Sequence, residues 1–313
     1  MTRCISEKVV FALVCLACLG TAVSAQVESK RSEGKQIVRQ VDHIVIRLDT
    51  TADAEALWSL FSEKLKLPIA WPPGDYGDFF SGGVSVGNVN LEFAYLSSRW
   101  LHSHSTPQFH TRAQLFGLGL EPEPLTLALR RLERRGLQHG QLEHHQIKDR
   151  DGSALTLWTQ VALPDVSREM SIFLCEYNPI IWRMSDPPHE DIEEARRALR
   201  DELRERDGGP AGVLSVKEIL IGTSDYKATR QRWETLLGAT AGEFAGHWQP
   251  GAGPAIRVAP APADGIQSIV IRVAGLDRAR RFLQANGLLG RSTKTTIAMD
   301  RDKLMGIGVQ LVE

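Results

Sequence analysis

Apolar and polar positions follow one repeating theme along most of the chain. The alternating segment HIVIRL at 43–48 is typical of a half-buried strand. An amphipathic helix is expected over 51–68, closed by its proline, and a final strand is expected at 89–96. Turn residues lie between these segments and predict further strands. The theme is therefore a strand, a helix and then two or three strands.

Spacing indicates that this theme occurs four times. His43 lies seven residues before Thr50, where the first strand is expected to end and its helix to begin. Gln114, Glu218 and Ser268 lie at the same distance before the expected start of a later helix. Repeats of this kind indicate a fold built from stacked or paired units. The sequence predicts an α+β protein of four βαβββ modules, paired into two domains.

The boundary between the two domains is marked by charge and turn residues. Modules one and two occupy 38–185, a charged segment spans 186–212, and modules three and four occupy 213–313. The segment is bounded by proline and glycine pairs, and its apolar stripe is thin. We expect a connecting helix that is mostly solvated, with a partner-binding helix as the alternative.

The N-terminus has the pattern of a secretory signal at 1–25. Arg3 and Lys8 precede a short apolar run, and small residues offer a cleavage site before Gln26. A periplasmic or secreted protein without stable membrane insertion is expected, with a retained anchor as the alternative. Cleavage would leave Cys175 as the one cysteine, so the mature chain is expected to have no internal disulfide.

Composition and motifs exclude several classes. The 313 residues carry a formal net charge of −1, which does not favour nucleic acid as a partner. No dinucleotide fingerprint, phosphate-binding loop, zinc-protease helix or nucleophile elbow is present. A small molecule is the expected partner, and the sequence leaves the oligomeric state open.

The segments VDHIVIRLDT and FFSGGVSVGNVNLEF resemble the vicinal oxygen chelate superfamily, with its glyoxalase-like, bleomycin-resistance and dioxygenase-type domains. The resemblance implies that paired βαβββ modules curl into a cupped sheet that holds a divalent metal. Ligands in that superfamily come from the first and last strand of each module. The resemblance therefore implies His43 and Glu92 from module one, and Gln114 and Glu176 from module two. The metal stays open among Zn²⁺, Ni²⁺, Mn²⁺ and Fe²⁺.

Strand alternation provides a partial test of these four ligand assignments. His43 and Val45 are expected to face the cup, with Ile44 on the opposite, helix-covered face. Glu92 is expected to point inward as well, and Glu176 to converge with it. Two buried carboxylates repel each other, and a divalent cation would remove that cost.

The second domain is expected to lack such a site. Its matching positions are held by Glu218, Arg257 and Ser268, and by Gln310 or Val312. An arginine beside a glutamate predicts a salt bridge in place of a metal. This pattern also argues against the extradiol dioxygenase branch, because two-domain members of that branch keep their ligands in the C-terminal half.

These residues predict an exported, metal-dependent lyase or isomerase acting on a small carbonyl or hydroxy compound. Glu92 or Glu176 would act as general base on a proton next to a carbonyl group. The alternative is a non-catalytic protein that sequesters a small molecule between aromatic walls. Histidines near the cup are expected either to contact substrate or to be solvated, namely His102, His104, His110, His144 and His145.

Overall fold

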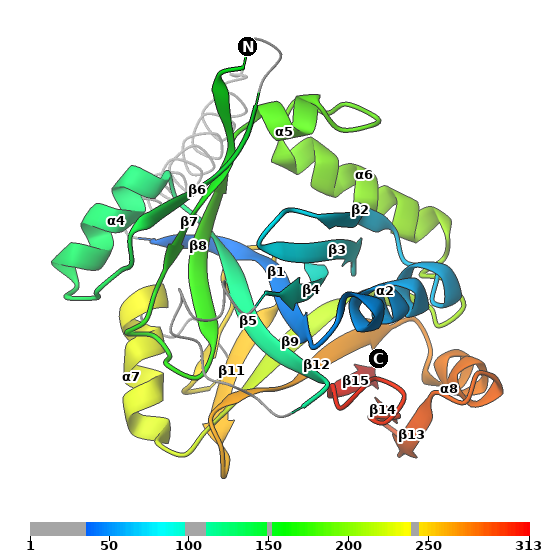
Figure 1. Ribbon diagram of the computed structural model, residues 1–313. Helices are drawn as coiled ribbons and strands as arrows, with labels where there is room; N and C mark the ends of the chain where they lie inside the picture. The colour runs from blue at the N-terminus through cyan, green and yellow to red at the C-terminus, as the bar shows by residue number, and fades with distance from the viewer. Residues whose placement is uncertain (1–35, 98–110, 149–151, 239–243) are drawn as a thin grey trace, which may run out of the picture. The chain divides into compact units, whose positions relative to one another are not determined.

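The computed structural model describes residues 36–97, 111–148, 152–238 and 244–313 (Figure 1). The expected signal segment and the histidines at 102, 104 and 110 lie outside these ranges. Within them, no helix is long and apolar enough to cross a membrane. Residues Ile37–Glu313 form one compact unit.

An eight-stranded mixed sheet contains the first two modules. Its strand order is β2-β3-β4-β1-β5-β8-β7-β6, so the two first strands, β1 and β5, pair antiparallel at the centre. Module one consists of β1 (Val38–Leu48), α2 (Thr51–Ser59), the π-helix η1 (Leu60–Lys64), β2 (Ile69–Asp75), β3 (Phe79–Ser85) and β4 (Asn90–Leu96). Module two consists of β5 (Ala113–Pro122), α4 (Leu125–Arg134), β6 (Leu142–Lys148), β7 (Ala154–Ala162) and β8 (Ser171–Tyr177).

A seven-stranded sheet repeats this plan in the order β10-β11-β9-β12-β15-β14-β13. Module three consists of β9 (Val213–Thr223), α7 (Tyr226–Leu237), β10 (His247–Trp248) and β11 (Ala255–Pro260). Module four consists of β12 (Gly265–Val273), α8 (Leu276–Ala285), β13 (Leu289–Ser292), β14 (Ile297–Met299) and β15 (Val309–Val312). The expected α+β fold of paired cupped sheets is confirmed, although the described part of module three has two strands after its helix.

Strand alternation separates the main core from the cup. Ile44, Ile46 and Leu48 of β1 are fully buried in the large core cluster. Val45 points the other way and belongs to a small separate cluster with Phe116. Burying one aliphatic side chain contributes roughly 1.5–3 kcal/mol, so a one-residue slip of β1 would be costly. The hydrophobic pattern therefore fixes which side chains enter the cup.

Strand register shows how closely the modules correspond. In module one His43 pairs with Asn90, and Val45 with Glu92. In module three Glu218 pairs with Ala255, two positions before the pair formed by Leu220 and Arg257. The expected alignment of Arg257 with Glu92 is thus confirmed.

Module four follows the same register. Val270, two residues after Ser268, pairs with Gln310, so Gln310 occupies the position that the sequence left open between Gln310 and Val312. In module three the expected salt bridge is also confirmed. Arg257 donates from Nε and Nη2 to the two carboxylate oxygens of Glu218, at 3.0 and 2.9 Å.

The segment between the domains contains the expected helix, most of whose side chains are at least partly exposed. It contains the long helix α6 (Ile192–Glu205), drawn beside β2 in Figure 1, and the short helix α5 (Ile180–Arg183) precedes it at the end of the first domain. Ala195 and Leu203 of α6 are buried, and Arg196 reaches the first sheet. The ion pairs of Arg196 therefore attach a helix with few buried side chains to the first sheet.

Candidate functional site

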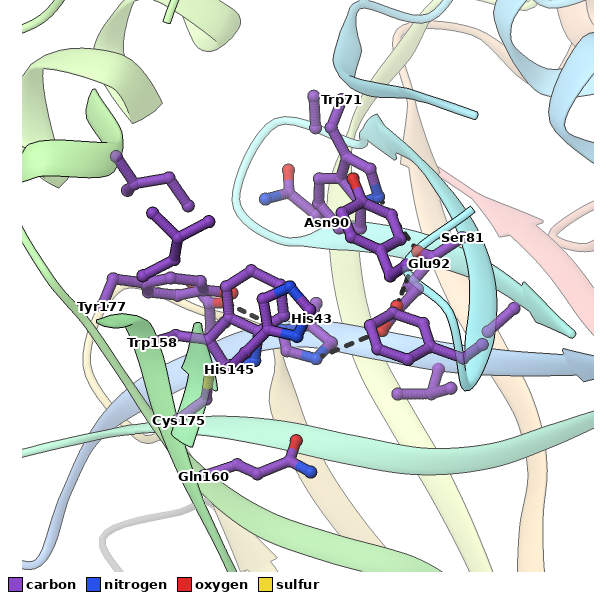
Figure 2. A pocket seen from close by; sticks show the side chains of 18 of the residues that line it. His43, Trp71, Ser81, Asn90, Glu92, His145, Trp158, Gln160, Cys175 and Tyr177 are labelled. Atoms are coloured by element: carbon purple, nitrogen blue, oxygen red, sulfur yellow. Dashed lines mark hydrogen bonds and ion pairs between the residues drawn. The ribbon is translucent and has the colours of Figure 1, made fainter. Parts of the chain in front are cut away.

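A cavity of about 1030 Å³ lies on the cupped face of the first sheet. Its walls come from β1, β4, β5 and β8, from the β2–β3 and β6–β7 hairpins, and from α5 and α6. The volume is at the upper end of the range of about 300–1,000 Å³ for small-molecule sites. Figure 2 shows His43 near the centre of the lining, with interactions on either side of its ring.

The His43 ring is held by close packing on the neighbouring strand. It lies against the backbone of Gly119, where an added Cβ would come within 2.1 Å of the ring carbon Cε1. The ring of Phe173, which pairs with Gly119 on the next strand, also contacts the imidazole, with centroids 5.4 Å apart. Glycine at 119 is therefore required because any side chain would displace the imidazole. This accounts for one glycine of the GLGLEP segment.

A β-bulge brings Asp42 to the same histidine. The pairing of β1 with β5 shifts register between Val41 and His43, leaving Asp42 as the extra residue. Bulges re-aim side chains in this way and are frequent beside active sites. His43 Nδ1 donates to Asp42 Oδ2 at 2.8 Å, and the Tyr177 hydroxyl donates to the same oxygen at 2.9 Å.

Helix α6 supplies the cation that balances Asp42. Arg196 donates from Nη2 to Asp42 Oδ1 at 2.5 Å and from Nη1 to Glu121 Oε2 at 2.6 Å. Its Nη1 also donates to Glu193 Oε1 at 2.8 Å. A buried carboxylate is stable only when it is paired and hydrogen-bonded. Arg196 thus joins the interdomain helix to the two central strands.

On the cavity side, His43 faces Glu92. Its Nε2 lies 3.4 Å from Glu92 Oε2, beyond the 2.7–3.2 Å of a well-formed N–H···O hydrogen bond. The other oxygen of Glu92 accepts from Ser81 Oγ at 2.7 Å, and Ser81 in turn accepts from Trp71 Nε1 at 3.0 Å (Figure 2). The carboxylate is held in place while one oxygen and the imidazole Nε2 both border the cavity.

These contacts set the charges of the site. Burial opposes ionisation of both partners, yet the hydrogen bond to His43 and the charges of His43 and Arg196 lower the pKa of Asp42 well below its usual value. The pKa of His43 is raised above 6.5: burial lowers it, but the Asp42 hydrogen bond and the charges of Glu92 and Asp42 outweigh burial. These contacts therefore favour the imidazolium form of His43.

Two further lining groups stay protonated at neutral pH. Burial raises the pKa of Tyr177 well above 10.0, and the charge of Asp42 adds to this. Burial likewise raises the pKa of the Cys175 thiol well above 9.0. Tyr177 thus remains a hydrogen-bond donor to Asp42, and Cys175 has no nucleophilic character in this state.

The structure brings together two of the four expected ligands. His43 and Glu92 meet at the cavity, as strand alternation predicted. Glu176 does not join them, because it shares its face of β8 with the core residue Leu174, opposite the lining residues Cys175 and Tyr177. The expected convergence of two carboxylates is corrected accordingly.

Glu176 instead completes a helix terminus. Its Oε1 accepts from the backbone N–H of Leu125 at 2.7 Å, at the start of α4. The N-cap of α4 is Pro124, which offers no side-chain acceptor, so the orphan donor needs a partner from elsewhere. In module four, Glu313 makes the same 2.7 Å contact to the first residue of α8, whose N-cap is a glycine.

The positions of these two glutamates correspond. Glu176 follows Phe173 by three residues, and Glu313 follows Gln310 by three, at matching points of β8 and β15. Modules one and three need no such residue because Thr50 caps its own helix, as Asp225 does in module three. Glu176 is therefore explained as a structural cap.

We expect Glu176→Ala to lower the free energy of unfolding by about 0.5–2 kcal/mol, the usual range for loss of an N-cap acceptor. Ligand binding in the cavity should be unchanged, because the carboxylate lies on the other face of β8. Chemical denaturation measures the first quantity. Glu313→Ala is the matched control and should have a similar effect. A change in the His43 resonances without a loss of stability would contradict this assignment.

Gln114 is also outside the cavity. It pairs with Arg47 on β1, and its Oε1 is buried without a partner in the described part of the chain. The sequence placed the start of the second helix at Glu121, which is three residues too early. Strand β5 continues to Pro122, and the N-cap of α4 is Pro124. Counting seven residues back from Pro124 gives Gly117 as the counterpart of His43.

The register of β5 and β8 completes this correspondence. Gly119, two residues after Gly117, pairs with Phe173, so Phe173 is the counterpart of Glu92. Module two therefore has a glycine and a phenylalanine where module one has an imidazole and a carboxylate. Neither residue can bind a metal through its side chain.

The donor set consequently does not fit the four-residue metal site that the superfamily implies. His43 and Glu92 provide two donors, whereas catalytic zinc sites use three protein ligands. Among the described residues, no group of three His, Cys, Asp or Glu side chains is arranged to hold a metal ion. The chemistry of the site is better accounted for by the side chains themselves.

Sequence reasoning missed Asp42 and Arg196. Alternation assigns Asp42 to the face opposite His43, and only the bulge overrides it. Arg196 is separated from Asp42 by 154 residues and has no local signal. The one signal in the sequence was that an acidic residue, Asp42, directly precedes the candidate histidine, His43.

The chain is similar to known proteins in structure and not in sequence. No family model matches the chain, and no curated protein matches it. A hypothetical protein from Staphylococcus aureus has a TM-score of 0.55 at 9% identity, covering 87% of this chain and 98% of its own.

Two enzymes are also similar in structure. A variant of 4-hydroxymandelate synthase from Streptomyces coelicolor gives a TM-score of 0.55 at 9% identity, covering 88% of this chain and 93% of its own. The 2,3-dioxygenase LapB from a Pseudomonas strain gives 0.51 at 10% identity, covering 89% and 93%. The chain has the vicinal oxygen chelate fold of these proteins, and at such identities the likeness extends to the fold alone.

Proposed function

We propose that the cavity is the active site of an enzyme that moves a proton on a small oxygenated molecule, as a lyase or isomerase does. The observation that carries the proposal is the continuous line Arg196–Asp42–His43–Glu92, which ends at the cavity. It places the His43 imidazole, whose protonated form these contacts favour, and the Glu92 carboxylate 3.4 Å apart at one surface.

Each residue has a distinct role in this proposal. Glu92 takes a proton next to a carbonyl group, held in place by Ser81. His43 donates from Nε2 to the oxygen on which negative charge develops. Asp42 fixes the ring through Nδ1 and stabilises the imidazolium. Arg196 is a positioning residue, because it acts through Asp42 and does not touch the substrate.

Deuterium exchange tests the proposal without knowledge of the full reaction. The protein, treated with a chelator and dialysed, is incubated in D₂O with a panel of small ketones, aldehydes and hydroxy ketones. Exchange of the proton next to the carbonyl is followed by NMR. We expect exchange on at least one compound, and its loss in Glu92→Gln.

Metal content of the same samples separates the competing mechanisms. One divalent ion per chain that survives dialysis and disappears in His43→Ala would contradict proton transfer by side chains alone. Exchange that is equal in wild type and Glu92→Gln would exclude Glu92 as the base. The alternative is a protein that sequesters its ligand, for which binding without exchange is the expected result.

The location of the protein belongs to the proposal as well. Export to the periplasm or medium is inferred from the apolar run within 1–25. N-terminal sequencing of the purified protein tests this, and a first residue of Gln26 is the expected result.

A further inference from the structure

A small apolar cluster forms one wall of the cavity beside the His43–Glu92 pair. It consists of Val45, Ala94, Leu96 and Phe116, with Phe79 and Phe173 packed against it, and all six line the cavity. Val45 pairs with Glu92 across β1 and β4, and Phe173 contacts the ring of His43. The cluster is separate from the main core of the molecule. The surface next to His43 and Glu92 therefore suits an apolar part of a ligand.

Exposed apolar side chains continue this surface from the cavity to the solvent. Ile69, Tyr76 and Met184 are exposed at 46, 36 and 58%, although all three are large hydrophobic residues. Each of them lines the cavity, so they lie at its mouth. Exposed apolar side chains that gather at one place indicate a binding surface, whereas scattered ones need no explanation. The mouth therefore suits the far end of a ligand whose body is apolar.

A ligand anion would find no free cationic side chain in the described lining. Arg196 is the one lysine or arginine there, and the three side chains that it contacts are all carboxylates. An anionic group that approached His43 would also meet Glu92, at 3.4 Å from the ring nitrogen. Burying a charge without a partner is costly, so the lining disfavours an anion.

A ligand cation would fare no better, because the acidic side chains of the described lining are paired or exposed. Asp42 accepts hydrogen bonds from three donors. Glu92 and Glu143 each accept from a neighbouring side chain. Asp78 and Asp186 are exposed, and water solvates their charges. A buried cation would therefore have to displace a partner that is already in place.

The hydrogen-bonding group that remains available beside the His43–Glu92 pair is uncharged. Asn90 pairs with His43 across β1 and β4, and its side chain lines the cavity (Figure 2). Its amide has no hydrogen-bond partner among the described residues. An amide donates to a carbonyl oxygen or accepts from a hydroxyl group without a charge on either side. The polar part of the cavity is therefore matched to a neutral oxygen group.

We infer that the cavity selects an uncharged ketone or aldehyde with an extended apolar body. This inference rests on the proposed function, in that the carbonyl group lies at His43 and Glu92. The body lies along the apolar cluster, and its far end reaches Ile69, Tyr76 and Met184 at the mouth. The volume of about 1030 Å³ is that of a site for a drug-sized ligand, so a short ketone leaves most of it unfilled.

A series of methyl ketones tests the apolar body. Binding of ethyl, butyl, hexyl and octyl methyl ketone is measured by calorimetry. The dissociation constant should fall about threefold for each methylene that the cavity buries. A dissociation constant that does not fall with chain length, or the absence of binding throughout the series, would overturn the inference.

Ions with the same number of carbon atoms test the charge preference. Hexyl methyl ketone is compared with octanoate and with octylammonium under the same conditions. The ketone should bind at least about tenfold more tightly than either ion, because neither ion finds a free partner in the lining. Equal or tighter binding of octanoate or of octylammonium would overturn the inference in favour of an anionic or a cationic ligand.

The mouth residues have a matched control. Ile69→Ser and Met184→Ser change exposed side chains, and each should weaken binding of octyl methyl ketone about three- to tenfold while leaving ethyl methyl ketone unchanged. Leu214→Ser changes a side chain that is 51% exposed but lies outside the lining, and it should alter neither. Unchanged binding of octyl methyl ketone in both mouth variants would overturn the placement of the body.

The same ketones distinguish this inference from the proposed function, because their exchange in D₂O is followed in parallel. Tight binding of long ketones without exchange would sustain the ligand class and refute the enzyme. Exchange confined to charged or short-chain compounds would sustain the enzyme and refute the ligand class.

Discussion

Arg196→Met is expected to lower the free energy of unfolding by about 3–5 kcal/mol, the range found when one partner of a buried ion pair is removed. The substitution keeps most of the apolar volume of the side chain, so the loss comes from charge. Asp42 would keep hydrogen bonds from His43 and Tyr177 but lose its guanidinium. Chemical denaturation measures the change.

Two controls separate the ion pair from general damage to α6. Arg197→Met alters the neighbouring, exposed arginine and should change stability by less than about 0.5 kcal/mol. The double variant Asp42→Asn with Arg196→Met removes both charges and should recover part of the loss. Strict additivity of the two single changes would show that the pair is not coupled.

A second measurement identifies Arg196 as a positioning residue. The charge of Arg196 lowers the pKa of His43, whereas the contacts with Asp42 raise it. Arg196→Met should therefore raise the pKa of His43 further, and Asp42→Asn should lower it. Both are followed through the imidazole resonances by NMR. A purely structural arginine would shift neither in this pattern.

The fold was accessible from sequence because the module repeats four times, each with its own periodic strand and helix. His43 and Glu92 were accessible for the same reason, since side chains alternate between the two faces from His43 to the end of β1 and around Glu92 in β4. Both predictions depend on local patterns that tertiary contacts do not override. The same alternation argument, applied consistently to β8, places Glu176 with Leu174 on the helix side.

The errors in module two share one physical cause. Pro124 is an N-cap without a capping side chain, so the start of α4 has no local signal and the count from Gln114 slipped by three residues. Glu176 of β8 supplies the missing acceptor for the start of α4. In the sequence this carboxylate has no evident partner, and it was therefore assigned to the metal site. A cap provided across the module cannot be recognised from spacing alone.

Asp42 and α6 required information that a single sequence does not contain. The bulge at Asp42 depends on the pairing partner, β5, and not on β1 itself. Helix α6 is attached to the first sheet by the Arg196 ion pairs, which its thin apolar stripe does not reveal. Long-range pairing of charges is the part of the site that hydrophobic patterning does not encode.

His43→Gln should lower the rate of the proposed proton transfer by about 10²–10⁴-fold, because a neutral amide cannot donate a full proton to the developing oxyanion. Deuterium exchange on the compound identified with wild type measures the rate. Binding of that compound should change far less than the rate. An unchanged rate would remove His43 from the mechanism.

The pH dependence gives an independent test of the same residue. The folded pKa of His43 is raised above 6.5, so its contribution to stability is complete below pH 6.5 and is lost as the pH rises through the folded pKa. The pKa of Asp42 is lowered from 3.8, so its contribution is present above pH 3.8 and is lost only as the pH falls through its folded value. Stability and exchange rate should therefore decline together on the alkaline side of pH 6.5. In His43→Gln the alkaline decline in stability should flatten, and the acid decline should become smaller without disappearing, because Asp42 loses its contacts with His43 but keeps those with Arg196.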